Sequence, residues 1–107
     1  MSEQSTFDAA DDGTVSLGGS LTFESVPLLY REMERRLPGA GPVTTIDLAG
    51  VTEADSAGLA LLLEWQSRQL QRGRELTMLG APENLLRLAE LCEAVDMLKL
   101  SGRTPAP

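Results

Sequence analysis

The chain has 107 residues, of which 42% are hydrophobic, and its formal net charge is −7. This length suits a single domain with one core and is too short for two. The acidic balance disfavours binding to nucleic acid and to anionic membrane surfaces, because both carry negative charge.

Histidine is absent and cysteine occurs once, as Cys92. A Ser-His-Asp or Cys-His catalytic system therefore cannot form, and a zinc or iron site with histidine ligands is excluded. The apolar neighbours Leu88, Ala89 and Leu91 predict that the Cys92 thiol is buried and unreactive. We expect no metal and no cofactor.

The sequence predicts neither a signal peptide nor a membrane span. Residues 1–5 lack the basic region and the apolar run of a signal peptide. No apolar run approaches the roughly 20 residues of a membrane span. We expect a cytoplasmic protein without membrane insertion, with a folded domain over residues 6–100 and flexible tails over residues 1–5 and 101–107.

The chain opens with the pattern of a β-hairpin. Short strands are predicted over residues 6–9 and 14–17, joined by an Asp-Gly turn at Asp12 and Gly13, since both residue types tolerate positive φ. Gly18, Gly19 and Ser20 are then expected to lead the chain out of the sheet.

A helix is predicted over residues 22–37, followed by a strand over residues 43–48. Thr22 or Ser25 suits the helix N-cap. The helix is expected to turn one apolar face to the core, formed by Val26, Leu29, Met33 and Leu37.

The second half repeats the alternation of helix and strand. A helix is predicted over Ser56–Gln71, with Gly73 suited to its C-terminal end, and a strand over residues 75–79. A third helix opens at Pro82, and its apolar stripe is Leu85, Leu88, Ala89 and Cys92. Residues 94–100 fit a last helical turn or an edge strand. The order predicts an α/β fold, with one mixed sheet packed against helices.

The strand that ends near Asp47 and the helix that begins at Ser56 enclose the most specific motif of the chain. Asp55 and Ser56 fall at a helix N-terminus, where free N–H groups favour negative charge. The pattern IDLxxVxxxDSxGL over residues 46–59 resembles the signature of STAS domains, and the likeness extends from residue 15 to residue 91. The resemblance implies the STAS fold and a non-catalytic binding role.

Two branches of that family fit the motif. In anti-sigma factor antagonists it usually reads DSSGLG, and the first serine, here Ser56, is phosphorylated by a partner kinase. Ala57 and Ala60 depart from that pattern. The run AGLALLL over residues 57–63 is more similar to the Mla-type STAS subunit, which sits on the ATPase subunit of a phospholipid-transporting ABC complex. This branch is favoured, and an anti-sigma factor kinase is the alternative partner.

Helical periodicity suggests which face of the second helix would meet a partner. Leu59, Leu62, Leu63 and Leu70 cluster on one side, which is the expected core face. Leu61 and Trp65 lie roughly 200° and 240° round from Leu59 and are expected to be exposed. Trp and Arg dominate interface hot spots. The predicted partner-binding residues are Asp55, Ser56, Ala57, Leu61, Trp65 and Arg68.

Simpler interpretations of the same residues stay open. Ser56 can serve only as an N-cap, and Asp55 can serve only to favour the helix dipole. Asp47 is interpreted as structural, bonding nearby backbone N–H groups. Residues 94–100 can cover Trp65 in place of a partner. An enzyme is the weakest of the function classes, because no pair of carboxylates or hydroxyls is placed with specificity.

Overall fold

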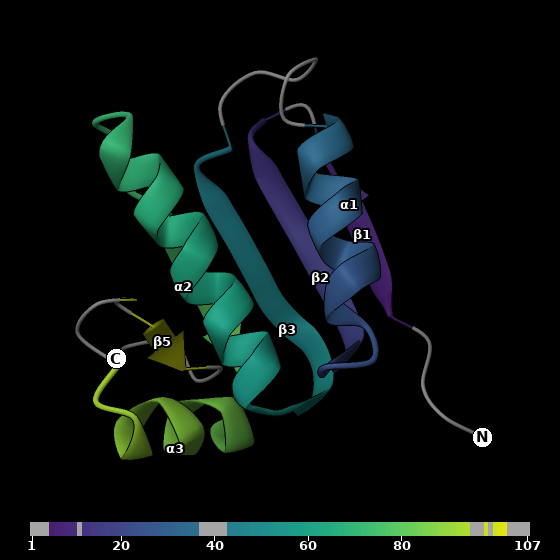
Figure 1. Cartoon of the computed structure of the whole chain (residues 1–107), viewed down its shortest axis with the longest axis vertical. Helices are drawn as coiled ribbons and strands as arrows, with labels where there is room; N and C mark the ends of the chain where they lie inside the picture. The colour runs from purple at the N-terminus through teal and green to yellow at the C-terminus, as the bar shows by residue number, and fades with distance from the viewer. Residues whose placement is uncertain (1–4, 11, 37–42, 95–97, 99, 103–107) are drawn as a thin grey trace.

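A mixed sheet of five strands forms the framework of the computed structural model, which describes residues 5–10, 12–36, 43–94, 98 and 100–102 (Figure 1). The strands lie in chain order, with β1 antiparallel to β2 and the other neighbours parallel. Their bounds are Thr6–Ala9 for β1, Thr14–Leu21 for β2, Thr45–Ala54 for β3, Thr77–Ala81 for β4 and Leu100–Gly102 for β5. The predicted α/β class and the first hairpin are confirmed.

Three helices connect the parallel strands, namely α1 (Val26–Arg36), α2 (Ser56–Gln71) and α3 (Glu83–Leu91). Each helix is a crossover between neighbouring parallel strands, which is the usual connection for such pairs. Figure 1 shows α1 and α2 side by side over the same face of the sheet, and both begin at the same end of the molecule. None of the helices in the described ranges is long and apolar enough to cross a membrane.

One face of the sheet supplies most of the core. Residues alternate along β2 between buried and half-buried, as expected for a strand with one covered face. The buried positions of the central strands include Val15, Leu17, Ile46, Leu48 and Met78. Helices α1, α2 and α3 add Leu29, Met33, Leu62 and Leu85 to the same cluster.

Two strands are longer than their sequence patterns indicated. Gly18, Gly19 and Ser20 do not lead the chain out of the sheet, because β2 continues through them to Leu21. Thr6 of β1 pairs with Gly18, and a Cβ at Gly18 would come within 2.5 Å of the Thr6 hydroxyl oxygen, so a larger residue there would require the Thr6 side chain to rotate. Strand β3 likewise continues past residue 48 to Ala54, and the β2–β3 register is irregular in this region.

The ends of several elements also differ from the predictions. Helix α1 begins at Val26 rather than at Thr22, and Leu37 lies outside the described residues. Strand β4 lies two residues later than predicted, and its Leu79 is exposed. Both alternatives for residues 94–100 are met in part: Leu98 is helical, with its N–H bonded to the carbonyl of Ala94 at 3.0 Å, and β5 begins at Leu100. This strand extends to Gly102, into the predicted C-terminal tail.

The environment of Cys92 was predicted wrongly. Cys92 is exposed, although Leu85 and Ala89 of the same predicted stripe are fully buried. Helix α3 ends at Leu91, and Cys92 serves as its C-cap. The apolar stripe therefore ends before the helix does, and Leu91 is itself 79% exposed.

Candidate functional site

Asp55 caps α2 and ties the start of this helix to the connection between β2 and α1. Its Oδ1 accepts hydrogen bonds from the backbone N–H groups of Ala57 at 2.9 Å and Gly58 at 3.1 Å. Its Oδ2 accepts a third from the backbone N–H of Phe23, also at 3.1 Å. One carboxylate thus satisfies free donors of the helix and fixes a segment 32 residues earlier in the chain.

The interpretation of Ser56 as the N-cap is wrong, since Asp55 holds that position and Ser56 is the first residue of α2. The Ser56 side chain is exposed, and its hydroxyl has no hydrogen-bond partner among the residues that the structure describes. Ala57 is half-buried beside it. A hydroxyl at the positive end of a helix is therefore presented to the surroundings with no structural task of its own.

The first turn of α2 is held close to the sheet by Gly58. A Cβ at this position would lie 2.1 Å from the carbonyl oxygen of Leu21 and 2.7 Å from its Cγ atom. Asp55 adds a hydrogen bond from its own backbone N–H to the same carbonyl, at 3.2 Å. The Asp55–Ser56 corner is consequently a rigid junction between the ends of β2 and β3 and the start of α2.

The predicted exposure of Leu61 and Trp65 is wrong. Leu61 is 4% exposed and Trp65 is 3% exposed. Helix α1 covers this flank of α2, and Trp65 and Met33 of α1 line the same small internal space. The opposite error occurs at Leu70, which was expected in the core and is 53% exposed.

Gln66 and Gln69 of α2 are buried, whereas Leu70, which was expected in the core, is exposed. The Gln66 side-chain amide donates to the carbonyl of Leu76 at 3.0 Å and accepts from its N–H at 2.9 Å. The Gln69 amide donates to the carbonyl of Val43 at 2.9 Å. These bonds satisfy polar groups that would otherwise be costly to bury, and they attach α2 to the starts of β3 and β4.

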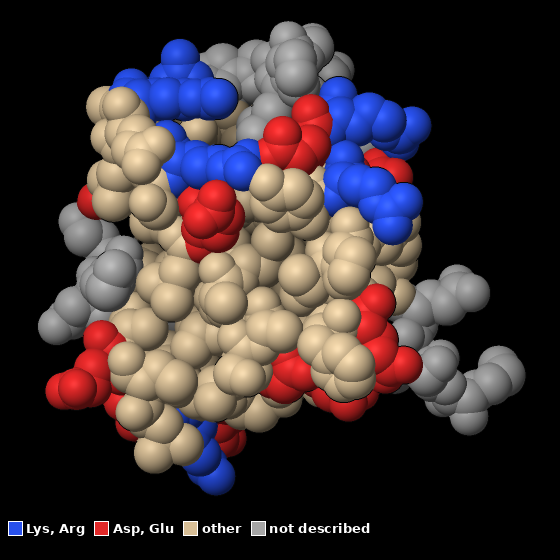
Figure 2. Space-filling model, viewed as in Figure 1, with Lys and Arg blue, Asp and Glu red and all other residues tan. Residues whose placement is uncertain are grey.

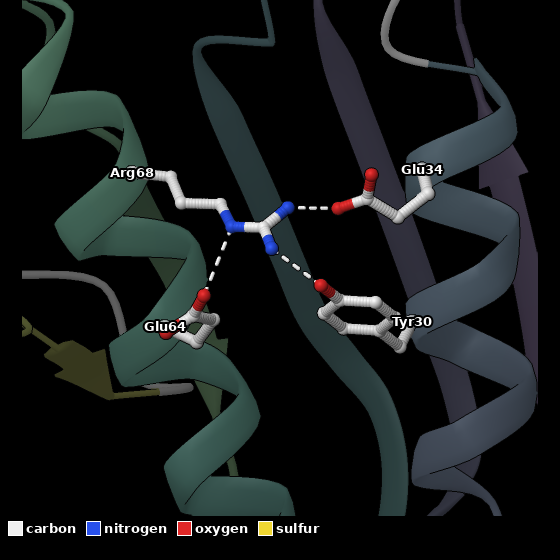
Figure 3. A network of polar contacts seen from close by, with 4 residues as sticks. All are labelled: Tyr30, Glu34, Glu64 and Arg68. Carbon is white, nitrogen blue, oxygen red and sulfur yellow. Dashed lines mark hydrogen bonds and ion pairs between the residues drawn. The ribbon is translucent and has the colours of Figure 1, made fainter.

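Arg68 joins α2 to α1. Its guanidinium pairs with Glu64 on its own helix at 2.9 Å and with Glu34 on α1, and it also donates to the hydroxyl of Tyr30 (Figure 3). The guanidinium carbon lies 5.1 Å from the centre of the Tyr30 ring, within the range of a cation–π contact. The side chain that was predicted to meet a partner is thus already engaged within the fold.

The exposed aromatic residue at the Asp55–Ser56 corner was not predicted. Phe23 is 69% exposed, follows the buried Thr22 and bonds to Asp55 through its backbone N–H. Phe23 lies in a turn before the helix, outside any helical or strand period, so no pattern indicated its direction. The predicted role of Asp47 is confirmed by its bond from the Ala49 N–H, at 2.9 Å.

Within the described part of the chain, no three His, Cys, Asp or Glu side chains are grouped so that they could hold a metal ion. The site consists of the bonded carboxylate of Asp55, the exposed hydroxyl of Ser56 and the exposed ring of Phe23.

The sequence and the fold can now be compared with known proteins. A family model described as "Mlab, STAS domain" matches residues 5–102. The chain belongs to the STAS domain family. Its relatives include the intermembrane phospholipid transport system binding protein MlaB of Escherichia coli (strain K12) and that of Shigella flexneri. Each is 32% identical over 91 residues, which covers 85% of this chain and 90% of the relative.

A solved structure has the same fold. The anti-sigma factor antagonist SpoIIAA in its unphosphorylated form superimposes with a TM-score of 0.70, covering 94% of this chain and 89% of that chain. The sequence identity is 18%, so this likeness concerns the fold alone. The STAS signature identified in the sequence falls on β3 and the first turn of α2, at the Asp55–Ser56 corner.

Proposed function

We propose that this STAS chain is a non-catalytic subunit that binds the ATPase of a phospholipid-transporting ABC complex of the Mla type. It would support the assembly or activity of that complex in maintaining outer-membrane lipid asymmetry. The observation that carries the proposal is the 32% identity with the MlaB proteins over 85% of the chain. Such a subunit would work in the cytoplasm, at the periphery of an inner-membrane complex.

The geometry of the corner suits docking better than catalysis. The carboxylate of Asp55 accepts three backbone N–H groups, which occupy three of its roughly four acceptor positions and hold it in a structural role. The backbone of Ser56 has a fixed position because the first turn of α2 is held against the sheet at Gly58. A rigid, exposed corner lets a partner bind without ordering a loop, and this lowers the entropic cost of association.

The test is the affinity for the purified ATPase subunit of the Mla-type complex from the same organism, measured by calorimetry. Ser56→Arg should weaken binding by about 2 kcal/mol, because a long charged side chain would stand in the contact. Ser67→Arg is the matched control, an exposed serine about three turns further along the same helix. Equal affinities for both variants and the unaltered protein would place the contact elsewhere, and no binding by the unaltered protein would refute the function.

A second candidate is an anti-sigma factor antagonist switched by phosphorylation of Ser56. The exposed, unbonded hydroxyl of this residue favours it. A phosphate would add about −1.5 to −2 charges at a helix N-terminus, where the dipole accepts them and an acidic partner would not. Incubation with the anti-sigma factor kinases of the organism and ATP, followed by intact mass measurement, decides between the candidates. A mass gain that Ser56→Ala abolishes supports the switch, and no gain removes it.

A further inference from the structure

One large apolar side chain stands in the open at the Asp55–Ser56 corner, where its backbone N–H is bonded to the carboxylate of Asp55. Phe23 is 69% exposed. Leaving a Phe side chain in water forgoes the free energy that its burial would supply. We call the surface defined by Phe23 and Ser56 the Phe23 surface.

The exposure of Phe23 is built into the fold. The residue before it, Thr22, is 8% exposed, and its backbone N–H donates to the hydroxyl oxygen of Ser25 at 2.9 Å. The Ser25 hydroxyl in turn donates to the carbonyl of Ser20 at 2.7 Å. Together with the bond from the Phe23 N–H to Asp55, these contacts fix the turn on both sides of the aromatic ring. The ring is therefore presented outward by a bonded turn.

Charge is distributed unevenly around this surface. Glu24 follows Phe23 directly and Glu53 precedes Asp55 by two residues, and both of these glutamates are exposed. Figure 2 shows acidic side chains at the end where α1 and α2 begin, and basic side chains mainly along the opposite end, where further acidic side chains lie between them. Exposed arginines at that opposite end include Arg35 in the last turn of α1 and Arg72 at the end of α2, whereas Arg31 lies in the middle of α1. The Phe23 surface thus has an apolar centre and an acidic rim.

This combination selects one kind of partner. A second copy placed across a two-fold axis at Phe23 would bring the acidic rims of both copies together, and like charges repel. A protein with an apolar socket and basic residues around it would be complementary in both respects.

We propose that the Phe23 surface is the part of this chain that docks on the ATPase, and that it fits a socket on the partner that is apolar at its centre and basic at its rim. This inference rests on the proposed function and adds the chemistry of the contact. Phe23 acts as the anchor. Glu24 and Glu53 guide the approach of the partner and set its orientation.

Four variants of the full chain test the anchor and the rim separately, with the purified ATPase subunit as the probe. Phe23→Ser is compared with Leu91→Ser, which alters a 79% exposed apolar residue on α3. Glu24→Lys is compared with Glu90→Lys, which reverses an exposed charge on α3. Circular dichroism confirms that each variant is folded, and association and dissociation rates are measured at about 50 and 500 mM salt, which screen surface charge to different extents.

Phe23→Ser should raise Kd about 30-fold, chiefly through faster dissociation, because buried aromatic anchors dominate interfaces. Glu24→Lys should lower the association rate about tenfold at low salt and remove most of its salt dependence. Both α3 variants should bind as the unaltered protein does. If each variant matches its control while the unaltered protein binds, the Phe23 surface is refuted and the proposed function stands. If the unaltered protein does not bind, both are refuted.

Discussion

Replacing Asp55 tests how one carboxylate holds the corner together. Asp55→Ala removes the acceptor for Ala57 and Gly58, and loss of an N-cap costs typically about 1 kcal/mol. It also removes the acceptor for the Phe23 N–H, which is exposed, so that water can replace part of this bond and the added cost is about 0.5–1 kcal/mol. The expected loss in the free energy of unfolding is about 1.5–2 kcal/mol.

Asp55→Asn separates the two contributions. Asparagine is nearly equal to aspartate as an N-cap, so the bonds to Ala57 and Gly58 should survive. Its amide nitrogen cannot accept a bond from the Phe23 N–H, so this variant should lose about 0.5–1 kcal/mol. The two variants therefore differ by the contribution of the helix cap.

Urea denaturation measures both variants, with the fluorescence of the buried Trp65 as the signal. The slope of the free energy against urea should stay unchanged, because the core is the same in all three proteins. The reasoning is refuted if Asp55→Ala loses less than about 0.5 kcal/mol, or if alanine and asparagine are equally destabilising, since the cap would then contribute nothing.

Three further predictions concern residues whose surroundings the structure defines. Gly58→Ala should lower the free energy of unfolding by at least about 2 kcal/mol, because its methyl group would overlap the carbonyl of Leu21. Ser56→Ala should be almost neutral in the same urea denaturation experiment. Equal stability of the two variants would mean that α2 can move off the sheet at no cost. Trp65→Ala should lower the free energy of unfolding by about 3–5 kcal/mol, measured by far-UV circular dichroism in urea, because the side chain is buried. A variant that stays equally stable but no longer binds the partner would contradict this and would support a direct contact of Trp65 with the partner. Cys92 should react with a thiol reagent in the native protein as fast as after denaturation, and strong protection would contradict its exposure.

Sequence patterns predicted the ends of an element correctly where nearby residues alone determine those ends. Helix α2 has the predicted bounds, because Asp55 can cap its start and Gly73 takes the positive φ of 74° that ends it. The first hairpin was predicted from its turn for the same reason, since Gly13 adopts a positive φ. The ends of β2 and β3 were not predicted, because two paired strands carry Gly18 and Gly50 where the isolated segments read as turns.

The sequence by itself determined the α/β class, the STAS family and the position of Ser56 at the start of α2, since each follows from local order and from a short motif. Tertiary structure decided which side chains the corner presents. Periodicity gives the angle between residues on a helix but not the number of sides that are covered. Because α1 covers the flank of α2 that carries Leu61 and Trp65, both became core residues, and Arg68 became the link between the helices. The exposed aromatic residue is Phe23, whose direction is set by a carboxylate 32 residues away.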